Sequence, residues 1–300
     1  MREGRDMDEQ EWLARQFEEH RPHLRAVAYR MLGSLSETDD AVQDAWLRVS
    51  RADAREVENL RAWLTTIVAR VALNMLRSRK TRREQPLDVH VPDPIVDPAD
   101  GTDPEHEALL ADAVGLALLV VLETLAPAER LAFVLHDMFA VPFEQIAPIV
   151  ERSPEATRQL ASRARRRVRG AAPVPDPDLG AQWKVVEAFI AASRTGDFDA
   201  LVAVLDPDVV LRADAGGLTD LSRHIQGAAA VAGQALWWSS QVDLTTRRAL
   251  VNGAPGVVSV RDGRPFSVGA FTVRNGRIVE IDFLADPERI RKLALNVLDN

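Results

Sequence analysis

A predicted helix near the middle of the chain constrains its fold most. Residues 153–169, SPEATRQLASRARRRVR, begin with Ser153 as a natural N-cap and with Pro154 at the first helical position. At helical spacing, one face is small and apolar and the opposite face is cationic. The apolar face holds Thr157, Leu160, Ala161, Ala164 and Val168, and the cationic face holds Arg158, Ser162, Arg165, Arg166 and Arg169. Residues 143–150 predict a shorter helix, and the two residues between them suit the turn of a helix-turn-helix. A solvated arginine-rich helix is the alternative interpretation.

Length and composition bound the class of protein. Three hundred residues suggest two or three domains, and a hydrophobic content of 46% suffices for packed cores. The absence of Cys excludes disulfide and thiolate chemistry. No apolar run approaches the roughly 18 residues of a membrane-spanning helix, and the charged N-terminus lacks the apolar core of a signal peptide. We therefore expect a cytoplasmic protein without membrane association.

The net charge of −8 hides a strong segregation of charge. Residues 21–84 hold thirteen basic and eight acidic side chains, and residues 151–172 hold seven Arg and two Glu. Residues 85–126 hold nine acidic side chains and no Lys or Arg. Two basic segments are thus separated by an acidic one, so a nucleic-acid partner is compatible with the acidic average.

The first basic segment predicts a helical block. Residues 36–40 are typical of a helix start, because acidic residues favour the positive end of the helix dipole, and the helix continues to Val49. A second long helix is predicted from about Asn59 to Lys80, with an apolar stripe of Leu64, Ile67, Val68, Val71 and Met75. Arg70, Asn74 and Arg77 share another face of that helix.

Two proline-rich segments divide the chain. Residues 85–104 are rich in Pro and Asp and predict an extended linker, and residues 171–180 predict a second one. Between them we expect helices over residues 105–125 and 127–138, followed by the helix-turn-helix. Pro148 should kink or shorten the first helix of that motif.

The tail changes character. Helices are predicted over residues 182–194 and 198–205 and within 224–240, with a short strand over 209–212. Four alternating stretches follow, at residues 242–251, 256–261, 265–274 and 277–284. Asn-Gly or Asp-Gly pairs join them, which are the strongest short hairpin signals. A four-stranded antiparallel meander with helices on one side follows, in an α+β domain.

These segments together resemble a known family. Residues 21–49 and 59–84 resemble region 2 of bacterial extracytoplasmic-function (ECF) sigma factors, and residues 125–169 resemble their region 4. The tail resembles the cone-shaped SnoaL-like fold. A sigma factor fused to such a domain is similar to the SigJ-type group, in which the added domain packs on the sigma regions and tunes their activity.

Three motifs of that group have partial counterparts here. The linker motif Trp-Leu-Pro-Glu-Pro corresponds to residues 90–94, the motif Asp-Gly-Gly-Gly-Lys to residues 214–218, and the late motif Asn-Pro-Asp-Lys-Leu to residues 286–290. The Trp of the first and the Lys of the second are missing. The resemblance implies regulatory roles for Pro92, Asp93, Pro94, Asp214, Gly216, Gly217, Asp286 and Pro287.

The expected fold is multidomain. Two all-α sigma domains, a region 2 bundle and a region 4 helix-turn-helix, precede a C-terminal α+β cone domain. We expect region 2 at residues 10–84, the acidic linker at 85–104, region 4 at 105–172 and the SnoaL-like domain at 180–300.

The resemblance assigns three interfaces. Core RNA polymerase, through its β and β′ subunits, is expected to contact Asp39, Asp40, Val42, Gln43, Asp44 and Trp46, although a capped solvated helix is the alternative. The −10 element is expected to contact Arg70, Asn74, Arg77, Arg79 and Lys80, as basic grooves do with single strands. The −35 element is expected to contact Arg158, Gln159, Ser162, Arg163, Arg165, Arg166 and Arg169. The acidic linker would mimic nucleic-acid charge inside polymerase, or act as a soluble spacer.

Other functions stay open for the tail. An enzyme of the cone fold would use an Asp–His pair, for which Asp214, His224 and Asp282 are the candidates, but the chain's single Tyr, Tyr29, lies in the sigma block. A small-molecule ligand could occupy a pocket lined by Val268, Phe271, Val273, Ile281 and Phe283. The alternative function is therefore a helix-turn-helix regulator with a sensing or catalytic tail. We expect a sigma factor without catalytic residues, metal or cofactor, with promoter DNA, polymerase and its own tail as partners.

Overall fold

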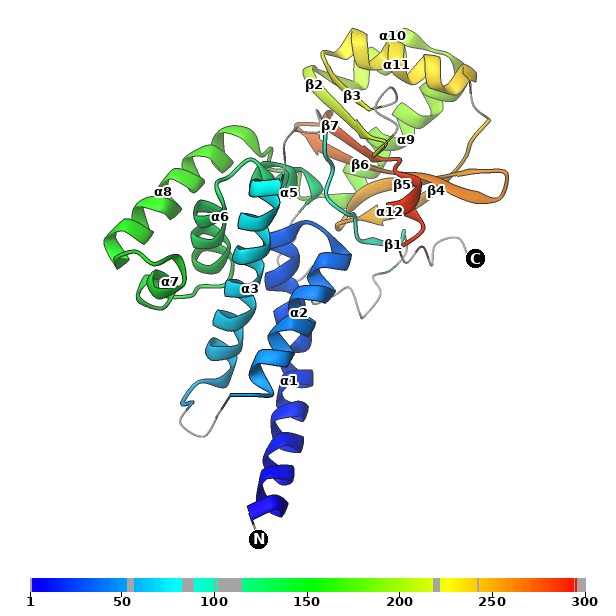
Figure 1. Ribbon diagram of the computed structural model, residues 1–300. Helices are drawn as coiled ribbons and strands as arrows, with labels where there is room; N and C mark the ends of the chain where they lie inside the picture. The colour runs from blue at the N-terminus through cyan, green and yellow to red at the C-terminus, as the bar shows by residue number, and fades with distance from the viewer. Residues whose placement is uncertain are drawn as a thin grey trace. The chain divides into compact units, whose positions relative to one another are not determined.

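The chain forms two compact units (Figure 1). The computed structural model describes residues 2–52, 57–82, 89–99, 101, 115–217, 222–241, 243–293 and 295. Of these, the residues up to 82 and those of 121–170 belong to unit 1. Those of 89–101, 115–120 and 171–295 belong to unit 2.

Unit 1 begins with three long helices, α1 (Arg2–Leu32), α2 (Leu35–Val49) and α3 (Leu60–Arg82), drawn in blue to cyan in Figure 1. Gly33 ends α1 with a positive φ of 68°, a conformation that glycine adopts without strain. The Asn59 carboxamide oxygen accepts a hydrogen bond from the Ala62 amide (3.0 Å) and so caps α3. The apolar stripe predicted for α3 packs inward, with Leu64 and Val68 fully buried.

The second half of unit 1 is the predicted helix-turn-helix. Three elements precede it along the chain. They are α5 (Leu116–Glu123), whose residues up to 120 belong to unit 2, then α6 (Pro127–Phe133) and a π-helical turn, η1 (Val134–Met138). The motif itself consists of α7 (Phe143–Val150) and α8 (Pro154–Ala171). Glu151 turns the chain between them with a φ of 57°, and the Ser153 hydroxyl accepts a hydrogen bond from the Ala156 amide (3.2 Å). The predicted cap and turn are confirmed; residues 105–114 of the helix predicted before them lie outside the described residues.

Two buried arginines join the halves of unit 1. Arg130 of α6 donates a hydrogen bond from Nε to the carbonyl oxygen of Arg30 in α1 (3.1 Å). The Arg30 guanidinium lies 4.8 Å from the ring centroid of Phe139. Burial lowers the pKa of Arg130 to about 10, so the group stays protonated at neutral pH. A cation therefore fixes the position of the helix-turn-helix on the first three helices.

Unit 2 is built on a seven-stranded sheet in the order β1-β4-β5-β6-β7-β2-β3. Its strands are β1 (Val96–Pro98), β2 (Leu205–Asp214), β3 (Arg223–Gln226), β4 (Thr245–Val251), β5 (Ala254–Arg261), β6 (Arg264–Arg274) and β7 (Arg277–Leu284). All neighbours are antiparallel except β2 and β7, which run parallel. The four predicted alternating stretches are confirmed as β4 to β7.

Helices cover one face of this sheet, as predicted. They are α9 (Leu179–Thr195), α10 (Phe198–Val204) and α11 (Ala228–Gln241), and a single turn, α12 (Pro287–Ile290), follows β7. Val186 and Phe189 of α9 pack with Val231 of α11 against Phe271 and Ile281 of the sheet. The predicted four-stranded meander was incomplete as a sheet. The short strand predicted over residues 209–212 lies within β2, and β1, β2 and β3 extend the sheet and make it mixed.

Acid should weaken unit 1 through His23. Its Nδ1 accepts a hydrogen bond from the Arg61 guanidinium (3.1 Å), and its Nε2 lies 3.0 Å from the Thr65 hydroxyl. Burial, with the nearby charges of Arg61, His20 and Arg30, lowers the pKa of His23 from 6.5 to about 4. Between these pH values the unfolded chain binds more protons than the folded one. The contribution of His23 to the free energy of unfolding is therefore fully present above pH 6.5 and is lost as the pH falls toward 4.

We expect this linkage to lower the free energy of unfolding of unit 1 by about 1–2 kcal/mol across that window, allowing for partial exposure. Thermal unfolding from pH 7.5 to 4 measures it. His23→Gln should flatten the pH dependence, whereas His224→Gln, at an exposed position of unit 2, should not. A pH profile of His23→Gln parallel to that of the wild type would contradict the prediction.

Candidate nucleic-acid and polymerase interfaces

The cationic face predicted for α8 is exposed. It presents Arg158, Gln159, Ser162, Arg166 and Arg169. The opposite face is buried through Thr157, Ala161 and Ala164, which are small enough to bring α8 close to its support. Among the described residues, no ion pair forms with Arg158, Arg166 or Arg169. This face therefore offers three cations and two polar groups to an anionic partner.

Two other predicted −35 residues are engaged inside unit 1. Arg163 donates from Nε to the Glu129 carboxylate (2.8 Å), and Arg165 donates from Nε to the Asp137 carboxylate (2.5 Å). Arg167, which the sequence prediction omitted, also reaches Glu129 (3.3 Å). The helical pattern alone did not reveal these pairs, because their carboxylates lie on α6 and η1.

An aromatic stack supports the first turn of α8. The guanidinium of Arg158 lies 5.3 Å from the ring centroid of Phe143 in α7. Phe143 stacks in turn on His136, with 3.8 Å between the ring centroids. His136 Nδ1 lies 3.0 Å from the Val141 carbonyl oxygen. Cation–π attraction to a ring that is itself held narrows the conformations that Arg158 samples.

The −10 face predicted for α3 is exposed in part. Arg70, Asn74 and Arg77 lie on the outside of α3, one turn apart. A groove of about 460 Å³ runs beside them, lined by residues of α2 and α3 that include Asp44, Asn74 and Arg79. The side chain of Lys80 lies outside the described residues.

Arg79 differs from its predicted neighbours. Its guanidinium pairs with the Glu37 carboxylate of α2 and donates to the Leu32 carbonyl oxygen (3.1 Å). These bonds place the charge of Arg79 at the junction of three helices. A contact with DNA would have to form from the part of the guanidinium that stays exposed.

The polymerase-docking residues predicted on α2 divide between its two faces. Asp40, Gln43 and Asp44 are exposed side by side, next to Leu47. Val42 lies on the opposite face and is fully buried, so it supports the helix from within. Asp39 pairs with Arg25 (2.9 Å), and Trp46 packs on Phe17. We call Asp40, Gln43, Asp44 and Leu47 the acidic face of α2.

In unit 2 two of the predicted regulatory residues, Asp93 and Asp214, meet at Arg289 of α12. Its guanidinium bonds to the carboxylates of Asp93 (2.6 Å) and Asp214 (2.8 Å) and to the carbonyl oxygen of Val91 (2.5 Å). His90 Nδ1 lies 3.2 Å from the same carboxylate of Asp214, which also accepts the Val91 amide (3.0 Å). We call these five residues the linker clasp, because two motifs of the C-terminal domain hold the third.

The clasp keeps Asp214 ionised. Burial alone would raise the pKa of this carboxyl, but hydrogen bonds from His90 and from the Val91 and Gly216 amides, with the charge of Arg289, lower it to about 2. Its stabilising effect is therefore present above the ordinary value of 3.8 and is lost as pH falls toward 2. Asp214 therefore stays ionised across the physiological range.

Two further features extend the clasp along the sheet. Ile95 and Asn252 exchange hydrogen bonds, from the Ile95 amide to the Asn252 side chain (3.0 Å) and from the Asn252 amide to the Ile95 carbonyl (2.9 Å). Residues 96–98 then pair with β4 as β1. Gly216 has a φ of 60° and abuts the Asp286 carboxylate, so a side chain at position 216 would collide with the cap of α12.

The three residues predicted as candidates for a catalytic Asp–His pair have other partners or lie exposed. Asp214 belongs to the clasp, and Asp282 is paired with Arg212 (3.0 Å) and buried. His224 is exposed on β3. The apolar residues predicted to line a ligand pocket mostly pack in the cores: Val268, Phe271, Val273 and Ile281 are buried, and Phe283 is partly buried.

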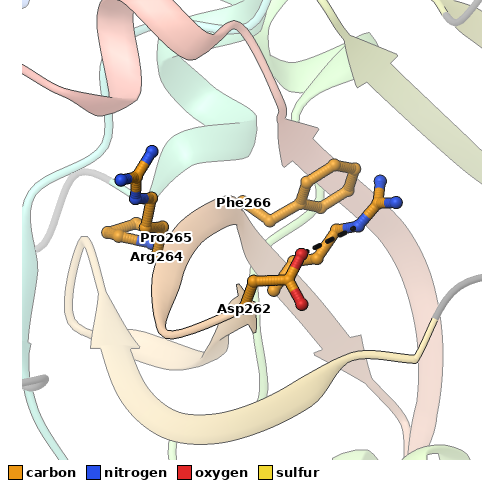
Figure 2. A pocket seen from close by; sticks show the side chains of 5 residues that line it. Asp262, Arg264, Pro265 and Phe266 are labelled. Carbon is orange, nitrogen blue, oxygen red and sulfur yellow. Dashed lines mark ion pairs between the residues drawn. The ribbon is translucent and has the colours of Figure 1, made fainter.

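A shallow pocket opens at the β5–β6 hairpin instead (Figure 2). It has a volume of about 360 Å³ and is lined by Arg261, Asp262, Arg264, Pro265 and Phe266, with Arg261 paired to Asp262 (3.8 Å). None of the site residues predicted from the sequence lies in it. Among the described residues, no group of three or more His, Cys, Asp and Glu side chains could hold a metal ion. Within the same part of the chain, none of the helices combines the length and apolarity that crossing a bilayer requires.

Comparison with known proteins gives the same order of segments. Sigma-70 region 2 matches residues 16–82, Sigma-70 region 4 matches residues 115–168, and the SnoaL-like domain matches residues 186–281. Over 291 residues the chain is 38% identical to the ECF RNA polymerase sigma factor SigJ of Mycobacterium tuberculosis, which covers 91% of this chain and 92% of the relative. The chain belongs to the ECF RNA polymerase sigma factors.

Two further comparisons agree with membership of the ECF sigma factors. The probable ECF RNA polymerase sigma factor SigI of Mycobacterium tuberculosis is 35% identical over 279 residues, covering 91% of this chain and 93% of the relative. The crystal structure of SigJ matches with a TM-score of 0.74 at 34% identity, covering 94% of this chain and 99% of the other. The expected fold class, two helical sigma domains and a SnoaL-like α+β domain, is confirmed, and the sheet of that domain is mixed.

Proposed function

We propose that this ECF sigma factor binds core RNA polymerase in the cytoplasm and directs it to promoters. Region 2, placed at residues 10–84, reads the −10 element with α3, and region 4, at residues 105–172, reads the −35 element with α8. The observation that carries the proposal is the exposed face of α8, where Arg158, Arg166 and Arg169 carry no ion pair among the described residues. Lys and Arg on such a face release counterions from DNA, and polar groups on it read base edges.

Polymerase docking falls to the acidic face of α2. Its carboxylates and the exposed Leu47 suit a basic partner helix of the β′ subunit. Region 4 is expected to contact the β subunit. Because these charges lie at the rim of a protein interface, they act mainly on the rate of association.

Reversing two of these charges, Asp40→Lys with Asp44→Lys, is expected to weaken binding to core polymerase by at least tenfold at low salt and less at high salt. Fluorescence anisotropy of the labelled chain with purified core measures the affinity. The matched control, Asp199→Lys with Asp262→Lys on unit 2, should bind as the wild type does. Equal affinities of the two double variants would contradict docking through α2.

We further propose that the C-terminal domain, placed at residues 180–300, acts on the sigma regions through the linker clasp. A linker segment whose backbone is bonded to Asp214, Asn252 and β4 is not available to polymerase. Asp93 and Asp97, whose side chains are buried, belong to the acidic linker, which the family resemblance expects to enter polymerase or to act as a spacer. Release of the clasp therefore increases promoter-directed initiation.

Run-off transcription tests the whole proposal. Purified core is supplied with the full chain, with a chain ending after Gly170, or with a chain ending near Leu284. The templates are promoters that holoenzyme made with the full chain has selected from a DNA library. Initiation at one defined start site that depends on both promoter elements is expected. If core gains no promoter-directed initiation with any of the three chains, the proposed function is wrong.

A further inference from the structure

Two carboxylates in region 4 divide the arginines of α8 into two groups. Arg163 and Arg167, one turn apart, share Glu129 of α6, the first through one carboxylate oxygen and the second through the other. Arg165 is held by Asp137 of η1. Arg158, Arg166 and Arg169 carry no ion pair among the described residues.

Glu129 is more buried than a carboxylate that forms only surface ion pairs. It is 8% exposed, whereas the side chains of Arg163 and Arg167 are half exposed. A buried carboxylate keeps its charge when cations compensate it, and here two guanidinium groups do so. Each guanidinium is thereby turned toward α6 and away from the exposed face of α8.

We propose that Glu129 is a positioning residue for promoter recognition that withholds Arg163 and Arg167 from the DNA backbone. This reassigns Arg163, which the sequence places among the −35 contacts, and it rests on α8 being the helix that reads DNA. Phosphates compete with Glu129 for the same donors. While Glu129 holds them, the chain binds DNA with fewer neutralised phosphates, and the sequence-independent part of its affinity stays low.

The consequence is measurable as a salt dependence. The logarithm of the binding constant falls with the logarithm of salt concentration, with a slope of about 0.9 for each phosphate neutralised on duplex DNA. Glu129→Gln keeps the shape and an acceptor oxygen but removes the charge that retains both guanidiniums. We expect the slope of its holoenzyme to steepen by about 0.9 for each released arginine, hence by up to about 1.8.

The measurement uses holoenzyme made from core polymerase and the full chain, on a promoter duplex and on the same duplex with its −35 element scrambled. The contribution of the core is common to all variants and cancels in the differences between slopes. Glu144→Gln is the matched control, because it removes an exposed carboxylate of α7 from the same region. It should leave the slope within about 0.3 of the wild type.

A double-mutant cycle isolates the proposed contact. Arg163→Ala should change the slope little in the wild-type background but lower it by about 0.9 in the Glu129→Gln background. Equal reductions in the two backgrounds would overturn the proposal, as would a wild-type slope for Glu129→Gln. If Glu129→Gln does not fold, the double variant Arg163→Gln with Arg167→Gln is measured instead. A salt-dependence slope equal to that of the wild type supports the proposal, and a slope lower by about 1.8 overturns it.

Arg166→Ala separates this inference from the proposed function. It should lower the slope by about one because Arg166 lies on the exposed face of α8. If it does so while the cycle shows no coupling between Glu129 and Arg163, only the positioning role is wrong. If Arg166→Ala and Arg158→Ala both leave DNA binding unchanged, α8 does not read the promoter and the proposed −35 contact fails as well.

Discussion

Replacing Arg289 with Met is expected to detach residues 89–98 from the sheet of unit 2. The substitution keeps much of the side chain's length but removes three polar contacts, two with carboxylates and one with a carbonyl oxygen. It leaves Asp93 and Asp214 buried without their shared cation. Breaking a buried ion pair by removing one partner costs about 3–5 kcal/mol, and each 1.4 kcal/mol is a factor of ten in the opening equilibrium.

Hydrogen exchange of the clasp amides reports this opening directly. The Val91 amide is bonded to Asp214 and the Ile95 amide to Asn252, so both exchange only when the linker segment leaves. We expect their exchange to accelerate by about 10²–10³-fold in Arg289→Met. Amides in the middle of β6 should keep their protection, because the sheet itself does not depend on the clasp.

Arg291→Met is the matched control, since Arg291 is exposed and its guanidinium, among the described residues, bonds to the Pro287 carbonyl within the same turn and not to the linker segment. It should leave the exchange at Val91 and Ile95 unchanged. Run-off transcription with the same two variants then tests regulation, and only Arg289→Met should raise the yield. Rapid exchange without a change in yield would show that the clasp is structural and not regulatory.

Local sequence patterns were enough to predict most of the secondary structure. Three Asn-Gly or Asp-Gly pairs predicted the hairpins from β4 to β7, and in each the first residue has a φ between 50° and 54° followed by a glycine at positive φ. The N-cap of α8 was equally explicit, because Ser153 and Pro154 are adjacent in sequence and act within one turn. Such features need no information from distant residues.

The parts that were not predicted depend on distant pairing. β1 has only three residues and includes Pro98, a composition that no strand pattern would select, and it forms because β4 offers a partner edge. The parallel pairing of β2 with β7 joins segments about seventy residues apart. Tertiary context therefore created β1 and decided how β2 pairs, although a local pattern had predicted a short strand within β2.

The candidate sites show the same division. The exposed face of α8 follows from helical periodicity within one segment. The linker clasp joins Arg289 to Asp93 across nearly two hundred residues, and only the resemblance to family motifs indicated that these segments act together. The retention of Arg163 by Glu129 depends on how α6 packs against α8, which periodicity within α8 cannot reveal.

Arg158→Ala is expected to have the largest effect on base preference at the −35 element. The side chain stands in the first turns of α8, the part that helix-turn-helix proteins present to base edges. Its guanidinium is guided by Phe143, whose ring is stacked on His136, so little conformational freedom is lost when it binds. A bidentate contact with guanine contributes about 1–3 kcal/mol of discrimination, or about 5- to 150-fold in affinity.

Arg166→Ala is the matched comparison, because it removes an exposed arginine from the same face two turns further on. A phosphate contact there would weaken binding to all sequences evenly and lower the salt slope by about one. Holoenzyme affinity is therefore measured for both variants on the selected −35 element and on single-base substitutions of it. Arg158→Ala should flatten the differences between substituted sites, and Arg166→Ala should preserve them. If both variants lose affinity equally on matched and scrambled elements, Arg158 contacts the backbone, and the base preference of region 4 must arise from Gln159, Ser162 or the shape of the DNA.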